Sequence, residues 1–95
     1  MKATIDGKRY DSDKCEVLGS HDHHNYSNNY SGTTYLVRAS DGTLLLWTRT
    51  NGQDCHLCDD LRLFDGDENW SIDDFYLNDK QEARCTELGL IKVVD

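Results

Sequence analysis

Two runs near the centre of the chain decide the fold. Residues 34–38 read Thr-Tyr-Leu-Val-Arg, residues 44–48 read Leu-Leu-Leu-Trp-Thr, and Asp41-Gly42 lies between them. Both runs are rich in the β-branched, aromatic and aliphatic residues that favour strands. An Asp-Gly pair tolerates the positive φ angles of a tight turn. This pattern predicts two adjacent antiparallel strands.

The flanking sequence extends this core in both directions. Asn51-Gly52 predicts a turn into a third segment near residues 54–58, and residues 61–64 continue that strand or add another. Upstream, Asp6-Gly7 predicts a short opening hairpin of residues 3–5 and 8–10. Residues 11–18 are expected to form a short helix with Ser12 as N-cap, although a strand is almost as well supported. Residues 19–32 are polar without periodicity and predict a loop.

The last third predicts a helix. Asn78 is a good N-cap, Gln81 stands at the third helical position as in a capping box, and Gly89 stands where a helix-terminating glycine belongs. Residues 90–94 then predict a final strand. The expected fold class is α+β: a single domain of 95 residues with an antiparallel meander, a C-terminal helix and a short N-terminal helix.

The charge of the chain is unevenly distributed. The net charge is −8, and residues 54–79 contain nine acids but only one base, Arg62. A contact with nucleic-acid phosphates needs a cation, so direct nucleic-acid binding is disfavoured and a basic partner surface is favoured. Solubility charge on solvated loops is the alternative. The predicted partner-binding residues are Asp59, Asp60, Asp65, Asp67, Glu68, Asp73 and Asp74.

Four cysteines suggest a structural zinc site. Cys55 and Cys58 are spaced so that two thiolates on a turn can hold one tetrahedral Zn²⁺. Cys15 and Cys85 would complete a four-thiolate site if the two helices packed over the meander. Alternatively, His21, His23, His24 or His56 supplies one or more of the ligands. The opposing interpretation is ordinary thiols, because positions i and i+3 of a regular strand point to opposite faces.

Catalytic interpretations are weaker. A thioredoxin-like role for Cys55 and Cys58 conflicts with the neighbouring acids Asp54, Asp59 and Asp60, which would raise the thiol pKa. No cysteine–histidine trio and no glycine-rich phosphate loop stands out. The first residues contain no apolar signal segment, and no stretch is long and apolar enough to span a membrane. We therefore expect a cytoplasmic binding protein rather than an enzyme.

One resemblance adds to this interpretation. Residues 4–20 read Thr-Ile-Asp-Gly-Lys-Arg-Tyr-Asp-Ser-Asp-Lys-Cys-Glu-Val-Leu-Gly-Ser. They resemble the opening of small proteins from Firmicutes phages and mobile elements, which begin Ile-Asn-Gly-Lys-x-Tyr-Asp-Thr-Glu-Thr-Ala and end the segment with Gly. The likeness continues loosely through residues 35–42, the strand after them, Trp70 and the predicted helix. The departures from the pattern are Asp6, Ser12, Asp13, Lys14 and Cys15.

The whole chain is also similar to type II-A anti-CRISPR proteins of streptococci, which are small acidic inhibitors of Cas9 and include a zinc protein. This resemblance implies stoichiometric binding to Cas9 inside the bacterial host and a block of target-DNA recognition or cleavage, without chemistry. The alternative is a zinc-stabilised adaptor or regulatory protein of a mobile element that binds another protein.

Overall fold

The structure is a computed structural model, and it describes residues 1–25, 30–50, 60–64, 71–92 and 94. Two small strands come first, β1 (Lys2–Ile5) and β2 (Lys8–Asp11), followed by the 3₁₀ turn η1 (Ser12–Lys14). The strands β3 (Glu16–Asn25), β4 (Tyr30–Arg38), β5 (Leu44–Thr50) and β6 (Asp60–Leu63) come next. A second 3₁₀ turn, η2 (Ile72–Asp74), precedes the helix α1 (Asp79–Glu87).

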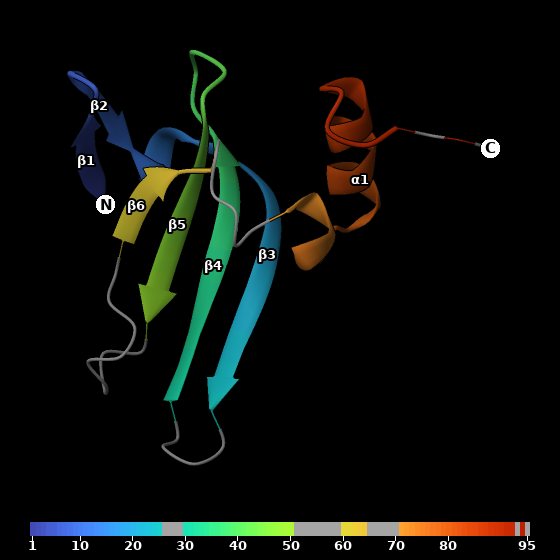
Figure 1. Cartoon of the computed structure of the whole chain (residues 1–95), viewed down its shortest axis with the longest axis horizontal. Helices are drawn as coiled ribbons and strands as arrows, with labels where there is room; N and C mark the ends of the chain where they lie inside the picture. Colours follow the sequence, from blue (N-terminus) through green and yellow to red (C-terminus); the bar gives the residue numbers. More distant parts are fainter. Residues whose placement is uncertain (26–29, 51–59, 65–70, 93, 95) are drawn as a thin grey trace.

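Strands β3 to β6 form one antiparallel sheet in the order β3-β4-β5-β6, and β1 and β2 form a separate hairpin (Figure 1). The register places Val37 opposite Leu45 and Leu36 opposite Leu46 on the two central strands. A β-bulge lies between Val17 and Gly19, where β3 pairs with β4. The central pair is therefore the one that the sequence predicts.

Each face of this sheet has its own apolar cluster, because neighbouring residues of a strand point to opposite faces. Val37 and Leu45 pack on one face with Tyr10 of the hairpin. Leu36 and Leu46 pack on the other face with Phe75. We call these the hairpin face and the helix face. The hairpin lies near the edge strand β6, and α1 lies beside the other edge strand, β3 (Figure 1). The two segments that cover the sheet are therefore centred on different edges of it.

The C-terminal segment is attached to β3 through its backbone. The backbone amide of Tyr76 donates to the carbonyl of Ser20 at 2.6 Å, and the backbone amide of Ser20 donates to the carbonyl of Tyr76 at 3.1 Å. Helix α1 then begins at the capping box of Asn78 and Gln81, and Gly89 follows its end with a φ of 80°. The predicted caps of this helix are confirmed. Among the described residues, none of the helices has the length and hydrophobicity needed to cross a membrane.

Three local predictions are wrong. Residues 11–18 form only the 3₁₀ turn η1 before β3 begins at Glu16, so the expected N-terminal α-helix is absent from this described stretch. Most of the predicted loop over residues 19–32 belongs to β3 and β4, whose backbone ladder needs no apolar side chains. Residues 90–92 are bends and irregular chain rather than a strand. The predicted segment at 54–58 lies outside the described residues.

Candidate functional site

The first predicted partner-binding residue within the described ranges, Asp60, begins the edge strand β6. It pairs with Thr48 and lies two residues before Arg62, whose Nε is 3.6 Å from its carboxylate. Thr48 belongs to the helix face, because it is two residues from Leu46 on the same strand. The Asp60 side chain therefore lies on the helix face, and half of its surface is exposed. An ion pair this exposed holds the carboxylate only weakly.

Asp73 and Asp74 lie at the opposite edge of the sheet. Both are exposed in η2, whose Ile72 packs against the apolar cluster of the helix face. Asp74 accepts a hydrogen bond from the backbone of Ser71 at 2.8 Å, and its carbonyl lies 2.9 Å from Nδ1 of His21 on β3. Asp74 thus has a structural role, whereas the side chain of Asp73 makes no hydrogen bond or ion pair within the described residues.

These three acids share one side of the sheet but do not form a compact cluster. Three strand spacings separate β3 from β6, which is about 14 Å across the sheet. The other four predicted residues, Asp59, Asp65, Asp67 and Glu68, lie outside the described residues.

The two coverings of the sheet differ in charge. The segment that covers the helix face, residues 71–92, contains five acids and three bases. Of these bases, Arg84 is already bound to Glu16 and Glu87. The hairpin side, residues 1–15, contains four bases and three acids. The segment that covers the helix face is therefore negative on balance, whereas residues 1–15 on the hairpin side are positive on balance.

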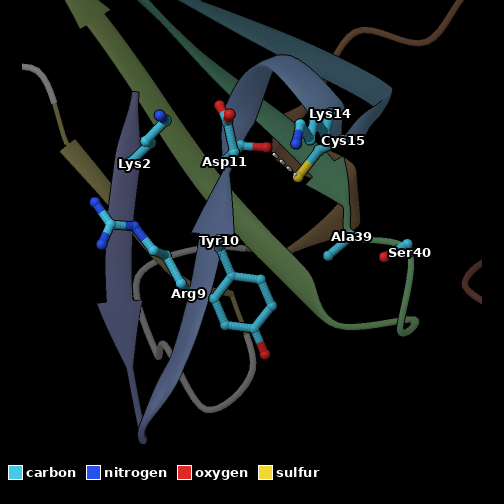
Figure 2. A pocket seen from close by; sticks show the side chains of 8 residues that line it. All are labelled: Lys2, Arg9, Tyr10, Asp11, Lys14, Cys15, Ala39 and Ser40. Carbon is cyan, nitrogen blue, oxygen red and sulfur yellow. Dashed lines mark hydrogen bonds between the residues drawn. The ribbon is translucent and has the colours of Figure 1, made fainter.

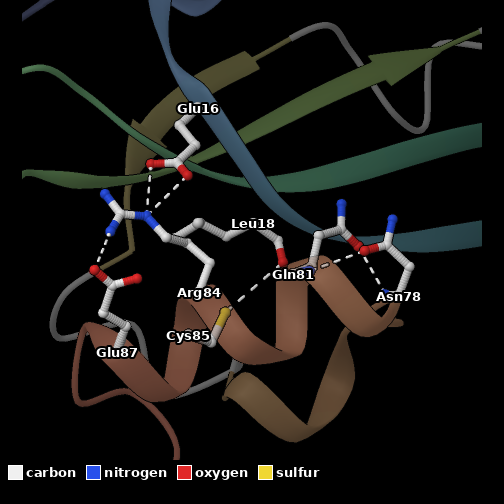
Figure 3. Close-up of polar contacts among 7 residues, drawn as sticks. All are labelled: Glu16, Leu18, Asn78, Gln81, Arg84, Cys85 and Glu87. Atoms are coloured by element: carbon white, nitrogen blue, oxygen red, sulfur yellow. Dashed lines mark hydrogen bonds and ion pairs between the residues drawn. The ribbon is translucent and has the colours of Figure 1, made fainter.

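Cys85 is a core residue of the helix face. Its side chain is completely buried on α1, and its Sγ donates to the carbonyl of Leu18 at 3.8 Å (Figure 3). Burial, and then the charge of Glu16, raise the pKa of this thiol. The neutral thiol is a poor nucleophile and a poor metal ligand, because both roles require the thiolate.

Cys15 lies on the other side of the sheet. It packs partly buried against the cluster of the hairpin face, and its Sγ donates to the carbonyl of Asp11 at 3.3 Å (Figure 2). Burial raises the pKa of this thiol, and the charges of Asp11 and Asp41 raise it further. Since the sheet stands between them, the structure does not bring Cys15 and Cys85 together around one ion.

The structure therefore does not support the predicted zinc site of four cysteines. Within the described ranges, no group of three or more His, Cys, Asp and Glu side chains is placed to hold a metal ion. Cys55, His56 and Cys58 lie outside those ranges, as do the side chains of His23 and His24. Zinc binding by this segment stays a prediction, and metal analysis of protein purified without added zinc tests it.

Sequence reasoning missed two features of the surface. The first is the ion-pair network of Arg84, whose Nε donates to both carboxylate oxygens of Glu16 at 3.2 and 2.9 Å (Figure 3). Hydrogen bonding to Glu16 raises the pKa of Arg84. The second is a pocket between the hairpin and the turn that follows β4. Neither has a sequence signal, because each joins residues that are far apart in the chain.

Comparisons of the chain with protein-family models, with curated proteins and with solved structures gave no match.

Proposed function

We propose that the chain is a non-catalytic binding protein that docks its acidic helix-face side on the cationic, nucleic-acid-binding surface of another protein. The partner we propose is Cas9, so that the chain acts as an anti-CRISPR-type inhibitor that blocks target-DNA recognition or cleavage. One observation carries this proposal: Asp60 and Asp73, from different parts of the acidic stretch, present exposed carboxylates on the same side of the sheet.

Electrostatics supports docking of this kind. A surface that holds phosphates is cationic, and a partner with a complementary negative surface associates faster and is steered into register. Arg84 of α1 is held by Glu16 at 2.9 Å and Glu87 at 3.2 Å, so its charge is compensated locally. The acids on this side are then left in excess.

The state of the described thiols also favours binding over chemistry. Cysteine catalysis requires a thiolate, and burial raises the pKa of both Cys15 and Cys85. Both thiols therefore stay protonated at neutral pH. Cys85 is in addition fully enclosed, and a substrate has no access to its sulfur.

The test is a cleavage assay with purified Cas9, guide RNA and target DNA, together with a pull-down. We expect a stable complex at low salt and loss of DNA cleavage at one equivalent of the protein, with relief as added salt screens the charges. The absence of a complex at low salt would remove Cas9 as the partner. A complex that leaves cleavage unaffected would remove the inhibitory function.

A further inference from the structure

A pocket on the hairpin side has a charge opposite to that of the chain as a whole. It has a volume of about 330 Å³ and lies where β1, β2, η1 and the turn after β4 meet (Figure 2). Ligand pockets start at roughly this size. Its lining residues are Lys2, Arg9, Tyr10, Asp11, Lys14, Cys15, Ala39 and Ser40.

Three cations line this pocket, and none of them has an internal partner in the described part of the chain. Lys2, Arg9 and Lys14 are exposed, and no carboxylate there lies within ion-pair distance of them. The chain has 18 acids and 10 bases, so acids to neutralise a base are plentiful. Three uncompensated cations around one cavity are therefore a local exception to the charge of the molecule.

The remaining polar groups of the pocket leave this positive charge in place. Asp11, the single carboxylate among the lining residues, accepts a hydrogen bond from the backbone of Asp13 at 3.1 Å. The hydroxyl of Tyr10 is bound to Asp41 and Thr43, both at 3.2 Å. Cys15 stays a neutral thiol, because burial raises its pKa. Three cations and one carboxylate leave two positive charges.

We propose that this pocket binds the phosphate group of a small phosphomonoester. A phosphomonoester carries a charge of about −1.5 to −2 near neutral pH, which matches the two uncompensated positive charges. The planar guanidinium of Arg9 suits phosphate oxygens, and Lys2 and Lys14 add two ammonium charges to the lining of the pocket. The size of the pocket suits a small molecule. This pocket is separate from the acidic residues of the helix face, so phosphate binding and the proposed function can be tested independently.

The test is a titration of the full chain followed by backbone amide NMR, with phenyl phosphate, inorganic phosphate and benzoate as probes. Phenyl phosphate and benzoate share the ring but differ in the charge and shape of the anion. We expect saturable shifts at residues 9–15 and 39–40, and binding of phenyl phosphate at least about tenfold tighter than that of benzoate. Binding of inorganic phosphate alone would show that the site takes free phosphate and would overturn the assignment to a phosphomonoester.

Matched variants separate the pocket from general surface charge. Arg9→Gln with Lys14→Gln should weaken phenyl phosphate binding at least about tenfold, because two charge-assisted contacts are lost. Lys80→Gln with Lys92→Gln removes two exposed cations from the other side of the molecule and should change nothing. The single Lys14→Gln provides the same comparison if the double variant fails to fold. Equal binding of benzoate, or an equal loss in the control, would overturn the proposal.

Discussion

Gly19 lies at the β-bulge of β3, directly against the segment that joins η2 to α1. A Cβ atom at this position would come within 2.6 Å of Cδ2 of Leu77 and 3.1 Å of Cβ of Phe75. Leu77 packs against the apolar cluster of the helix face, and Cβ of Phe75 is fixed to the backbone, so neither neighbour moves aside freely. We expect Gly19→Ala to lower the free energy of unfolding by about 1–3 kcal/mol, the usual cost of overpacking. Urea denaturation measures this change.

A double variant checks the cause of that loss. In a Leu77→Ala background, Gly19→Ala should cost clearly less, because the nearest clashing side chain has been removed. An equal cost in both backgrounds would show that Leu77 is not the neighbour that excludes the methyl group.

Asp41, in the turn between β4 and β5, makes the stability of the fold depend on pH. The backbone amide of Thr43 donates to its carboxylate at 3.0 Å, and this bond is the main reason why the pKa of Asp41 lies below its ordinary value of 3.8. A carboxyl whose folded pKa is depressed stabilises the fold above its unfolded pKa, and this contribution is lost as the pH falls through the folded value.

Asp41→Asn keeps a side-chain oxygen that can accept from Thr43 but removes the charge. We expect the variant to melt at a lower temperature than the parent at pH 7, and we expect this difference to shrink at acidic pH, as the pH falls through the folded pKa of Asp41 and its carboxyl group becomes neutral. Thermal unfolding followed by circular dichroism measures the difference. A gap that persists unchanged at the acidic pH would mean that the charge of Asp41 is not its source.

At the scale of elements, α1 depends on its N-terminal capping box. Oδ1 of Asn78 accepts from the backbone of Gln81 at 2.8 Å, and Oε1 of Gln81 accepts from the backbone of Asn78 at 2.9 Å. Asn78→Ala should lower the free energy of unfolding by about 1 kcal/mol, whereas Asn78→Asp keeps the acceptor and should cost little. Chemical denaturation of both variants is the measurement. An equal loss in the two would contradict the capping role.

Elements with a local signal were predictable from the sequence. The hairpin around Asp6-Gly7, the central strand pair and the caps of α1 each depend on residues that are close in the chain, and the structure has all three. The strand β3 was missed because its second half carries polar residues on both faces: His21 is half-buried on the helix face and Asp22 is exposed on the hairpin face. A strand of this kind is specified by its pairing with β4 and not by hydrophobic alternation.

The candidate site was less predictable because the sheet decides which of the predicted residues lie on the same face. Cys15 and Cys85 pack on different faces of the sheet. Their positions depend on the alternation of side chains along the strands, on the bulge at Gly19 and on the path that the chain takes to α1. None of these is visible in the spacing of cysteines. The acidic stretch could be located in the sequence, but only the register of β6 shows that Asp60 points to the same side as η2.

At the scale of the whole molecule, charge is unevenly distributed across the sheet. Exposed carboxylates such as Asp73 lie on the helix-face side, while the uncompensated cations of the pocket lie on the hairpin side. A molecule with this asymmetry should approach a cationic partner in a preferred orientation. The consequence is that the position of a charge, rather than the net charge of −8, determines its effect on binding.

The most direct test compares two double variants with the same net charge in a salt-dependent measurement of Cas9 binding. Asp60→Asn with Asp73→Asn removes two charges from the helix-face side, and Asp6→Asn with Asp13→Asn removes two from the hairpin side, where Asn also tolerates the φ of 52° at residue 6. We predict that the first pair slows association by about tenfold at low salt and that the second pair leaves it unchanged. Equal effects of the two pairs, or none from the first, would contradict the account.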